Sequence, residues 1–308
     1  MDNIEEKLSL VRDKINAKRK QAILLQDKKN RNKLCACLDT IWDVQVAIHE
    51  YNKLPDDSDS LYLPIYWLLQ GLYLQTDAVG HLHQAIIWST IKFNTEYPNL
   101  QNIRELRNDI VWHPTSRRDK KSKEEIASFH VIGRITMSKK WFTAINYCPD
   151  SEDIIKHIDI IDAIKKQQLD IYKIIDSILD FLIKEELEHK KNFQNEKIVK
   201  IIPDIFGYHI SKLYESIHSN YVIPRISLQS IDDIFKNIKN EIIKRYTTYD
   251  FYQHEMDKIE YIITYLFNVF DWKISKDWNE IEIHIDVLKM EFENLKEILK
   301  EIDNEFLI

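Results

Sequence analysis

The chain has 308 residues, of which 30% are charged and 44% hydrophobic, a balance typical of a globular protein with one large or two ordinary domains. Its net charge of −7 excludes nucleic-acid binding through overall positive charge, so contact with nucleic acid would need a local basic patch. Its four glycines form neither GxGxxG nor GxxxxGK, which argues against a dinucleotide fold and a P-loop.

The cysteines and the charge distribution predict a cytoplasmic protein. The three cysteines, Cys35, Cys37 and Cys148, are odd in number and show no framework spacing, which is typical of a reducing compartment. The N-terminus is charged, so we expect no signal peptide. The least charged run, residues 61–76, contains polar residues and is shorter than a bilayer span, so we expect a buried helix rather than its alternative, a membrane helix.

The first half of the chain is predicted to be helical. Residues 2–53 fit one or two helices, of which the charged segment 1–30 is an N-terminal helix of its own. After turn residues at 54–60, residues 61–93 form a second helix that is hydrophobic on nearly all sides and therefore central. One polar row interrupts it, which is either a solvent-facing strip or one wall of a site: Gln70, Asp77, His81 and Gln84.

A helix over residues 100–113 carries the most unusual pair of side chains. Its apolar stripe, which includes Ile103 and Ile110, also contains Arg107, although an arginine is rarely buried unless it is paired or used. His113 stands at the edge of the same stripe, and Pro114 predicts that the helix ends at or just before it. The densest basic cluster of the chain follows, either as a solvated loop or as a phosphate-binding patch: Arg117, Arg118, Lys120, Lys121 and Lys123.

The second half begins with a change of pattern. β-Branched and aromatic residues predict a β-hairpin over 129–147 with its turn at residues 138–140. Ser151 is then predicted to cap a helix that runs to about residue 192, and helical periodicity returns at 205–219, 228–247, 249–271 and 277–304. We therefore expect three parts: an N-terminal charged helix (1–30), a helical domain with a hairpin insertion (31–195) and a C-terminal helical domain (196–308).

Metal and cofactor sites are not indicated. Cys35 and Cys37 lack a second pair, and their thiols diverge on a helix. His254 and Glu255 begin like HExxH, but Lys258 stands where the second histidine would be. We therefore predict no metal and no cofactor.

Arg107 and His113 suit RNA cleavage without a metal. That reaction needs a group that takes the 2′-hydroxyl proton and a group that protonates the leaving 5′-oxygen, and histidine suits both steps. It also needs a fixed cation against the charge of the transition state, which the planar guanidinium provides. One Arg/His pair supplies one proton-transfer group, so two copies of the chain would supply two. The alternative is a structural arginine inside a helix bundle and a histidine at a helix terminus.

The stretch LRNDIVWHP resembles the signature of the HEPN-domain family (higher eukaryotes and prokaryotes nucleotide-binding). That motif is an arginine, then four to six residues, then a histidine, with a polar residue directly after the arginine. Arg107, Asn108 and His113 match it residue by residue. The resemblance covers roughly residues 30–192 and implies an all-α, HEPN-like helical bundle with a small hairpin insertion, followed by a second helical region.

The resemblance also implies a function. Active members are homodimers and metal-independent endoribonucleases that leave 2′,3′-cyclic phosphate ends, often in anti-phage defence or as toxins. Arg107 would bind phosphate, His113 transfer protons and Asn108 orient both. Arg117, Arg118, Lys120 and Lys121 would bind the substrate RNA, with Asp77 and His81 as further candidates. An antitoxin or other regulatory partner is expected, although Thr115 replaces the tyrosine of one antitoxin-controlled subgroup.

Two other functions fit the same residues. A non-catalytic helical interaction module could keep the motif for packing, with residues 198–308 as its partner-binding surface. The same pocket could instead bind a nucleotide, which a ligand-induced thermal shift would test.

Overall fold

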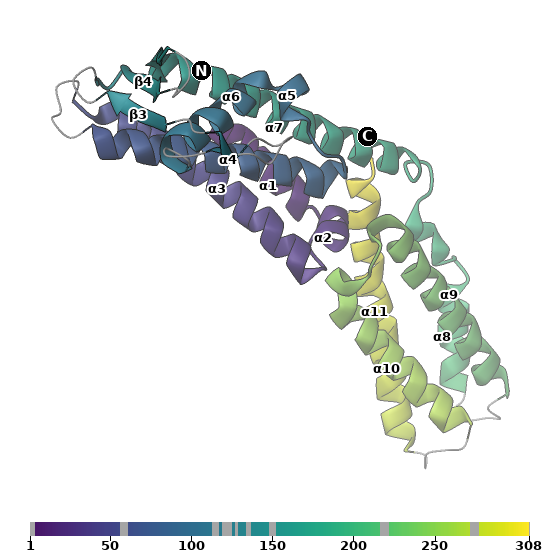
Figure 1. Ribbon diagram of the computed structural model, residues 1–308. Coiled ribbons are helices and arrows are strands. Elements are labelled where there is room, and N and C mark those ends of the chain that lie inside the picture. Colours follow the sequence, from purple (N-terminus) through teal and green to yellow (C-terminus); the bar gives the residue numbers. More distant parts are fainter. Residues whose placement is uncertain are drawn as a thin grey trace. The chain divides into compact units, whose positions relative to one another are not determined.

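The computed structural model describes residues 4–55, 61–112, 117–118, 125–126, 129–133, 137–147, 152–215, 222–271 and 277–307 (Figure 1). Helices make up most of this part of the chain, which confirms the helical prediction, and the strands are few and short. The chain divides into two compact units: unit 1 is Met1–Asn16 with Leu24–Ile183, and unit 2 is Ala17–Ile23 with Lys184–Ile308. This division falls after Ile183, earlier than the expected boundary near residue 195, because the long helix that ends at Lys191 contributes to both units.

Residues 4–53, the described part of the first segment, form three helices rather than the one or two expected. They are α1 (Ile4–Asn16), α2 (Lys18–Leu24) and α3 (Lys28–Lys53). The break before α3 has a local cause, because a carboxylate oxygen of Asp27 accepts a hydrogen bond of 2.7 Å from the backbone N–H of Asn30. This side chain satisfies a backbone donor that has no partner within the helix, so the chain can start a new helix there.

The central helix α4 (Tyr62–Ile87) is shorter than predicted. It ends because Trp88 adopts a left-handed backbone conformation with φ 63°, so the prediction of helix over 88–93 is wrong except for Phe93 itself, which starts α5 (Phe93–Glu96). Pro98 then begins α6 (Pro98–Arg107), at a position where a missing N–H costs nothing. Within the described residues, no helix is long and apolar enough to cross a membrane.

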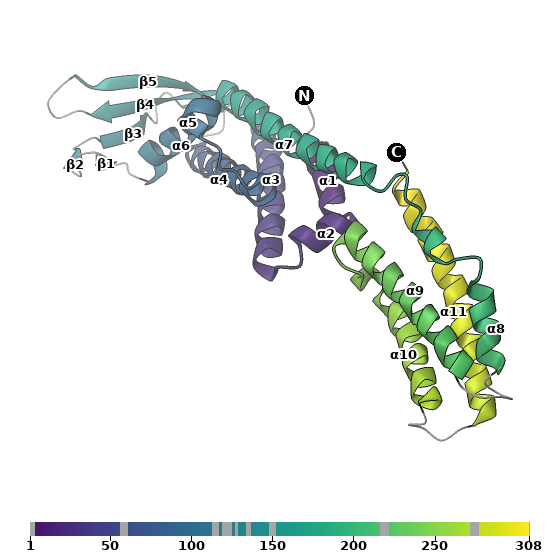
Figure 2. The same ribbon diagram turned by 90° about the vertical axis from the view of Figure 1, so that its right-hand side faces the viewer.

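The predicted hairpin is present. Strands β3 (Phe129–Gly133) and β4 (Trp141–Tyr147) pair antiparallel, and the Ser138 hydroxyl accepts hydrogen bonds from the backbone N–H groups of Lys140 and Trp141 in the turn. A third strand, β5 (Ile154–Asp159), pairs with the other edge of β4, so the sheet order is β3-β4-β5 (Figure 2). A two-residue pair, β1 (Arg117–Arg118) and β2 (Glu125–Ile126), is separate from this sheet.

The predicted helix start at Ser151 is wrong in part. Residues 154–159 are strand, and helix α7 (Ile160–Lys191) begins after them, with Asp159 Oδ1 accepting a hydrogen bond of 2.8 Å from the N–H of Asp162. Asp159 therefore has the capping role expected of Ser151, which lies outside the described residues. The isoleucines of this stretch fit a helical stripe, but they also favour a strand, and the unpaired edge of β4 decides between the two.

The core of unit 1 places the sheet against α6. One buried cluster joins α1, α3, α4 and α7, and a second joins α3, α4 and α6 to the sheet and the start of α7. In the second cluster, Ile103 and Ile110 come from the motif stretch, while Ile132 and Phe142 come from β3 and β4. The turn that follows α6 contacts both α4 and β3, so it lies between the central helix and the sheet.

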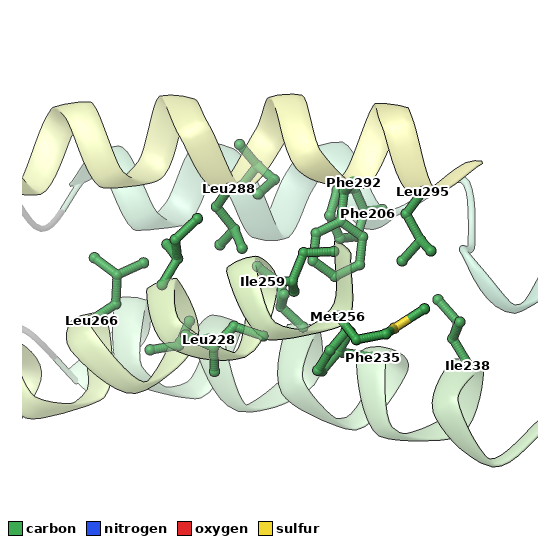
Figure 3. Close-up of a cluster of buried hydrophobic side chains, with 14 of the residues drawn as sticks. Phe206, Leu228, Phe235, Ile238, Met256, Ile259, Leu266, Leu288, Phe292 and Leu295 are labelled. Atoms are coloured by element: carbon green, nitrogen blue, oxygen red, sulfur yellow. The ribbon is translucent and has the colours of Figure 1, made fainter. Parts of the chain in front are cut away.

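Unit 2 confirms the helical periodicity of the C-terminal region. Its elements after α7 are η3 (Ile198–Ile201), α8 (Phe206–Tyr214), α9 (Val222–Tyr246), η5 (Asp250–Tyr252), α10 (Gln253–Phe270) and α11 (Trp278–Glu305). Helix α9 begins earlier than predicted because Pro224 is accommodated in its first turn. Figure 3 shows the buried side chains that these helices share, and the rings of Phe206 and Phe292 join α8 to α11 with centroids 4.6 Å apart.

Candidate functional site

Arg107 is the last residue of α6 and is buried. It follows Leu100 and Ile103 on the buried face of the helix, as the apolar stripe predicts, and only 7% of it is exposed. An arginine this buried must have its guanidinium held by other groups, because transfer of an isolated charge out of water is strongly unfavourable. Its neighbours therefore decide what it can do.

Three neutral groups hold the guanidinium of Arg107. Its Nε donates a hydrogen bond of 2.8 Å to Gln70 Oε1, and its Nη1 donates one of 3.0 Å to Asn108 Oδ1. Its Cζ lies 4.1 Å from the centre of the Tyr73 ring, a distance at which the π face attracts a cation. These contacts fix the position of the guanidinium at the end of α6.

A second arginine lies one helical turn earlier. Arg104 forms an ion pair with Asp77, and its Cζ is 5.0 Å from the centre of the Tyr73 ring. Tyr73 therefore contacts the guanidinium groups of both Arg104 and Arg107. The sequence interpretation missed Tyr73, although its place between Gln70 and Asp77 at helical spacing could have identified it.

The predicted polar row of α4 splits into two parts. Gln70 and Asp77 face α6 and contact its two arginines, so this part of the row faces the helix of Arg107, as one of the two interpretations expects. His81 is exposed, and Gln84 accepts a hydrogen bond of 3.3 Å from Lys33 of α3. Of the two candidate binding residues in this row, Asp77 is thus placed beside Arg107's helix through its ion pair, whereas His81 faces solvent.

The helix changes character directly after Arg107. Residues Asn108–Trp112 form the π-helical turn η1, a wider winding that is rare and frequent at functional sites. His113 comes next and lies outside the described residues, as do Lys120, Lys121 and Lys123. Arg117 and Arg118 form strand β1, and their side chains are likewise outside the description. The structure thus describes Arg107 and Asn108 of the predicted catalytic set.

The opposite face of the same turn borders a cavity of about 440 Å³. Asp109 lies there with its Oδ1 4.0 Å from Nε2 of His130, a residue of β3. Lys156 and His157 from β5 line the cavity from the sheet. Sequence reasoning missed these residues, because the register of the sheet, rather than any motif, brings them to α6.

Metal-binding clusters are absent from the described part of the chain, where no group of three or more His, Cys, Asp or Glu residues could hold an ion. Cys37 is buried and Cys35 exposed on α3, and Cys148 lies outside the described residues. Comparison with protein-family models, with curated proteins and with solved structures gives no match. The contacts within the chain are therefore the basis of any functional proposal.

Proposed function

We propose that the protein is a metal-independent endoribonuclease of the HEPN type that acts in anti-phage defence or as a toxin. The observation that carries the proposal is the guanidinium of Arg107, which is buried, fixed by hydrogen bonds to Gln70 and Asn108, and located directly before a π-helical turn that leads to His113. A cation held in a fixed position is what the negative charge of a phosphoryl transition state needs. No cofactor is required for this chemistry.

The proposed reaction uses one residue for charge and another for protons. His113 takes the proton of a 2′-hydroxyl, whose oxygen attacks the adjacent phosphorus, and a protonated histidine gives a proton to the departing 5′-oxygen. The products are a 2′,3′-cyclic phosphate end and a 5′-hydroxyl end. Arg107 stabilises the charge on the phosphorane-like transition state, and Asn108 keeps the guanidinium in place through its 3.0 Å hydrogen bond. Arg117, Arg118, Lys120 and Lys121 would attract the RNA backbone.

A homodimer would supply the second histidine. An exposed apolar stripe runs along α4, with Leu63, Trp67 and Leu74 exposed by 63%, 67% and 44%. Gln70, which holds Arg107, lies within the same stripe at helical spacing. Large exposed apolar side chains in a row are typical of protein interfaces, so we place the contact between two copies along this stripe.

The proposal is tested with purified protein and a fluorescent single-stranded RNA in EDTA. We expect cleavage by the wild type, a loss of at least a hundredfold with His113→Ala, and a partial loss with Arg107→Lys, which keeps the charge but not the planar fork. The matched control is His49→Ala, an exposed histidine on α3, which should cleave normally. Wild-type protein that leaves RNA intact, or a His113→Ala variant that cleaves like the wild type, would refute the proposal.

The dimer is tested separately. Trp67→Glu should convert the dimer to a monomer in sedimentation velocity and reduce cleavage, whereas Trp42→Glu on α3 should leave both unchanged. A wild-type protein that is monomeric at the concentrations used for cleavage contradicts the composite site.

One observation favours a non-catalytic interaction module instead. Arg107 is almost fully buried, and its contacts with Gln70, Asn108 and the Tyr73 ring are those of a packing residue between α4 and α6. This alternative predicts that Arg107→Ala lowers the melting temperature, that neither Arg107→Ala nor His113→Ala changes RNA, and that both variants keep any partner binding.

A further inference from the structure

Unit 2 contains a groove that the proposed ribonuclease site does not use. It has a volume of about 1020 Å³ and lies between η3, α8 and α11. Its apolar lining comes from η3, the segment after it and α8: Val199, Ile202, Pro203, Phe206 and Ile210. The tilted rings of Phe206 and Phe292, whose centroids are 4.6 Å apart, pack α8 against α11.

The wall on α11 is strongly basic. Lys289, Lys296 and Lys300 are separated by seven and four residues, which places them on one face of the helix over a length of about 16 Å. Lys200 of η3 adds a fourth ammonium group to the lining. Lys300 forms an ion pair of 2.6 Å with Glu297 of its own helix. Two carboxylates, Asp204 and Glu293, also line the groove, so its four lysines still leave the lining net positive in a chain whose net charge is −7.

The wall on α8 leaves room for an incoming side chain. Gly207 is exposed on this helix, and a Cβ built on it would have no other atom within 4 Å. Its backbone has a negative φ, so the absence of a side chain is not needed for the backbone conformation. Gly207 therefore lines the groove without occupying any of its space.

We propose that this groove binds an acidic amphipathic helix of a partner protein. The apolar lining would take one stripe of the partner helix, and the lysines of α11 would meet glutamates or aspartates on the adjacent stripe at matching helical spacing. The groove thereby gives the C-terminal unit a role as a docking module. This inference stands on contacts in unit 2 and does not depend on the ribonuclease proposal.

The lining fits a protein helix better than a nucleic-acid strand. Single-stranded nucleic acids bind through stacking on exposed aromatic rings and an uninterrupted basic track. The two aromatic rings of this lining offer little exposed surface for stacking, because Phe206 is buried and Tyr214 is half-buried. Asp204 and Glu293 would also repel phosphates.

The test uses the full chain and a fluorescein-labelled designed helix with leucines on one stripe and glutamates on the next, measured by fluorescence anisotropy at physiological salt. A second helix with lysines in place of the glutamates is the matched probe. We expect binding of the glutamate helix only. Lys289→Glu combined with Lys296→Glu should weaken that binding at least tenfold.

Two further variants separate charge, shape and folding. Gly207→Leu fills the groove without changing its charge and should also weaken binding at least tenfold, with no decrease in the melting temperature because leucine favours a helix. Lys184→Glu combined with Lys191→Glu, which has the same spacing of seven on α7, should leave binding unchanged.

The outcomes that overturn the proposal are concrete. Equal binding of both helices, no binding of the glutamate helix, or binding that survives Gly207→Leu and the α11 double variant would each exclude it. A single-stranded RNA that binds in a manner dependent on Lys289 and Lys296 and displaces the peptide would identify the groove as a nucleic-acid site instead.

Discussion

The contribution of the hydrogen bond between Arg107 and Gln70 to the free energy of unfolding can be measured with variants of the two residues. Arg107→Met keeps most of the length of the side chain but removes the donors to Gln70 and Asn108 and the contact with the Tyr73 ring. Two hydrogen bonds at about 1 kcal/mol each and a cation–π contact of about 1 kcal/mol are lost, while the burial cost of one charge disappears. We expect a net loss of about 2 kcal/mol in the free energy of unfolding, or about 4–8 °C in melting temperature.

A double-mutant cycle isolates the pair. Gln70→Leu removes the acceptor alone, and the double variant with Arg107→Met should cost less than the sum of the two single variants by about 1 kcal/mol. His81→Leu serves as the control, because His81 is exposed on the same helix and should add to Arg107→Met without coupling. The assay is differential scanning calorimetry of all six proteins at pH 7.

The result that refutes this reasoning is a coupling energy indistinguishable from that of the His81 control. Gln70 would then not hold the guanidinium, and Arg107 would be free to adopt another position than the one described. A coupling of the expected size together with unchanged RNA cleavage by Gln70→Leu would show that the bond serves stability alone.

Two other predictions follow from the structure. Burial lowers the pKa of His189 below its ordinary value, so the folded state prefers the neutral ring, and the free energy of unfolding should fall as the pH drops below about 6.5. The His189 ring bonds the Arg245 carbonyl oxygen at 2.8 Å, and His189→Gln keeps a donor for it but does not titrate, so this variant should lose less stability at low pH in urea unfolding. An unchanged pH dependence would assign the loss to other groups. On α4, Gly80→Ala would bring a Cβ to 2.9 Å from Phe93 Cζ and should cost about 1–3 kcal/mol, whereas Gly71→Ala meets Val44 at an ordinary 3.7 Å and should gain about 0.5–1 kcal/mol. Equal melting temperatures for the two alanine variants would contradict this difference.

Local patterns in the sequence were sufficient to predict most of the helices. The isoleucine and leucine stripes of α7 and α11 repeat at the helical period, and these side chains are buried where the period places them. The turn residues at 138–140, with the β-branched and aromatic residues beside them, were sufficient to predict the hairpin, because a hairpin depends on contacts between residues close in sequence. Arg107 in an apolar stripe was enough to predict a buried and therefore partnered cation.

The tertiary structure decided the features that hydrophobic periodicity left open. Residues 154–159 satisfy both a helical and a strand pattern, and only the free edge of β4 selects the strand. Two partners of Arg107, Gln70 and Tyr73, come from a helix more than thirty residues away, so no spacing near the motif identifies them. In the same way, the groove between α8 and α11 joins residues nearly ninety positions apart.

By itself, the sequence determined where helices form and which of their faces are buried, because those properties depend on side chains within a few turns of one another. Only the tertiary structure decided which polar side chains meet Arg107, that the sheet has a third strand, and that lysines of α11 line an apolar groove. These contacts depend on strand pairing and helix packing between distant segments, which a local period cannot specify.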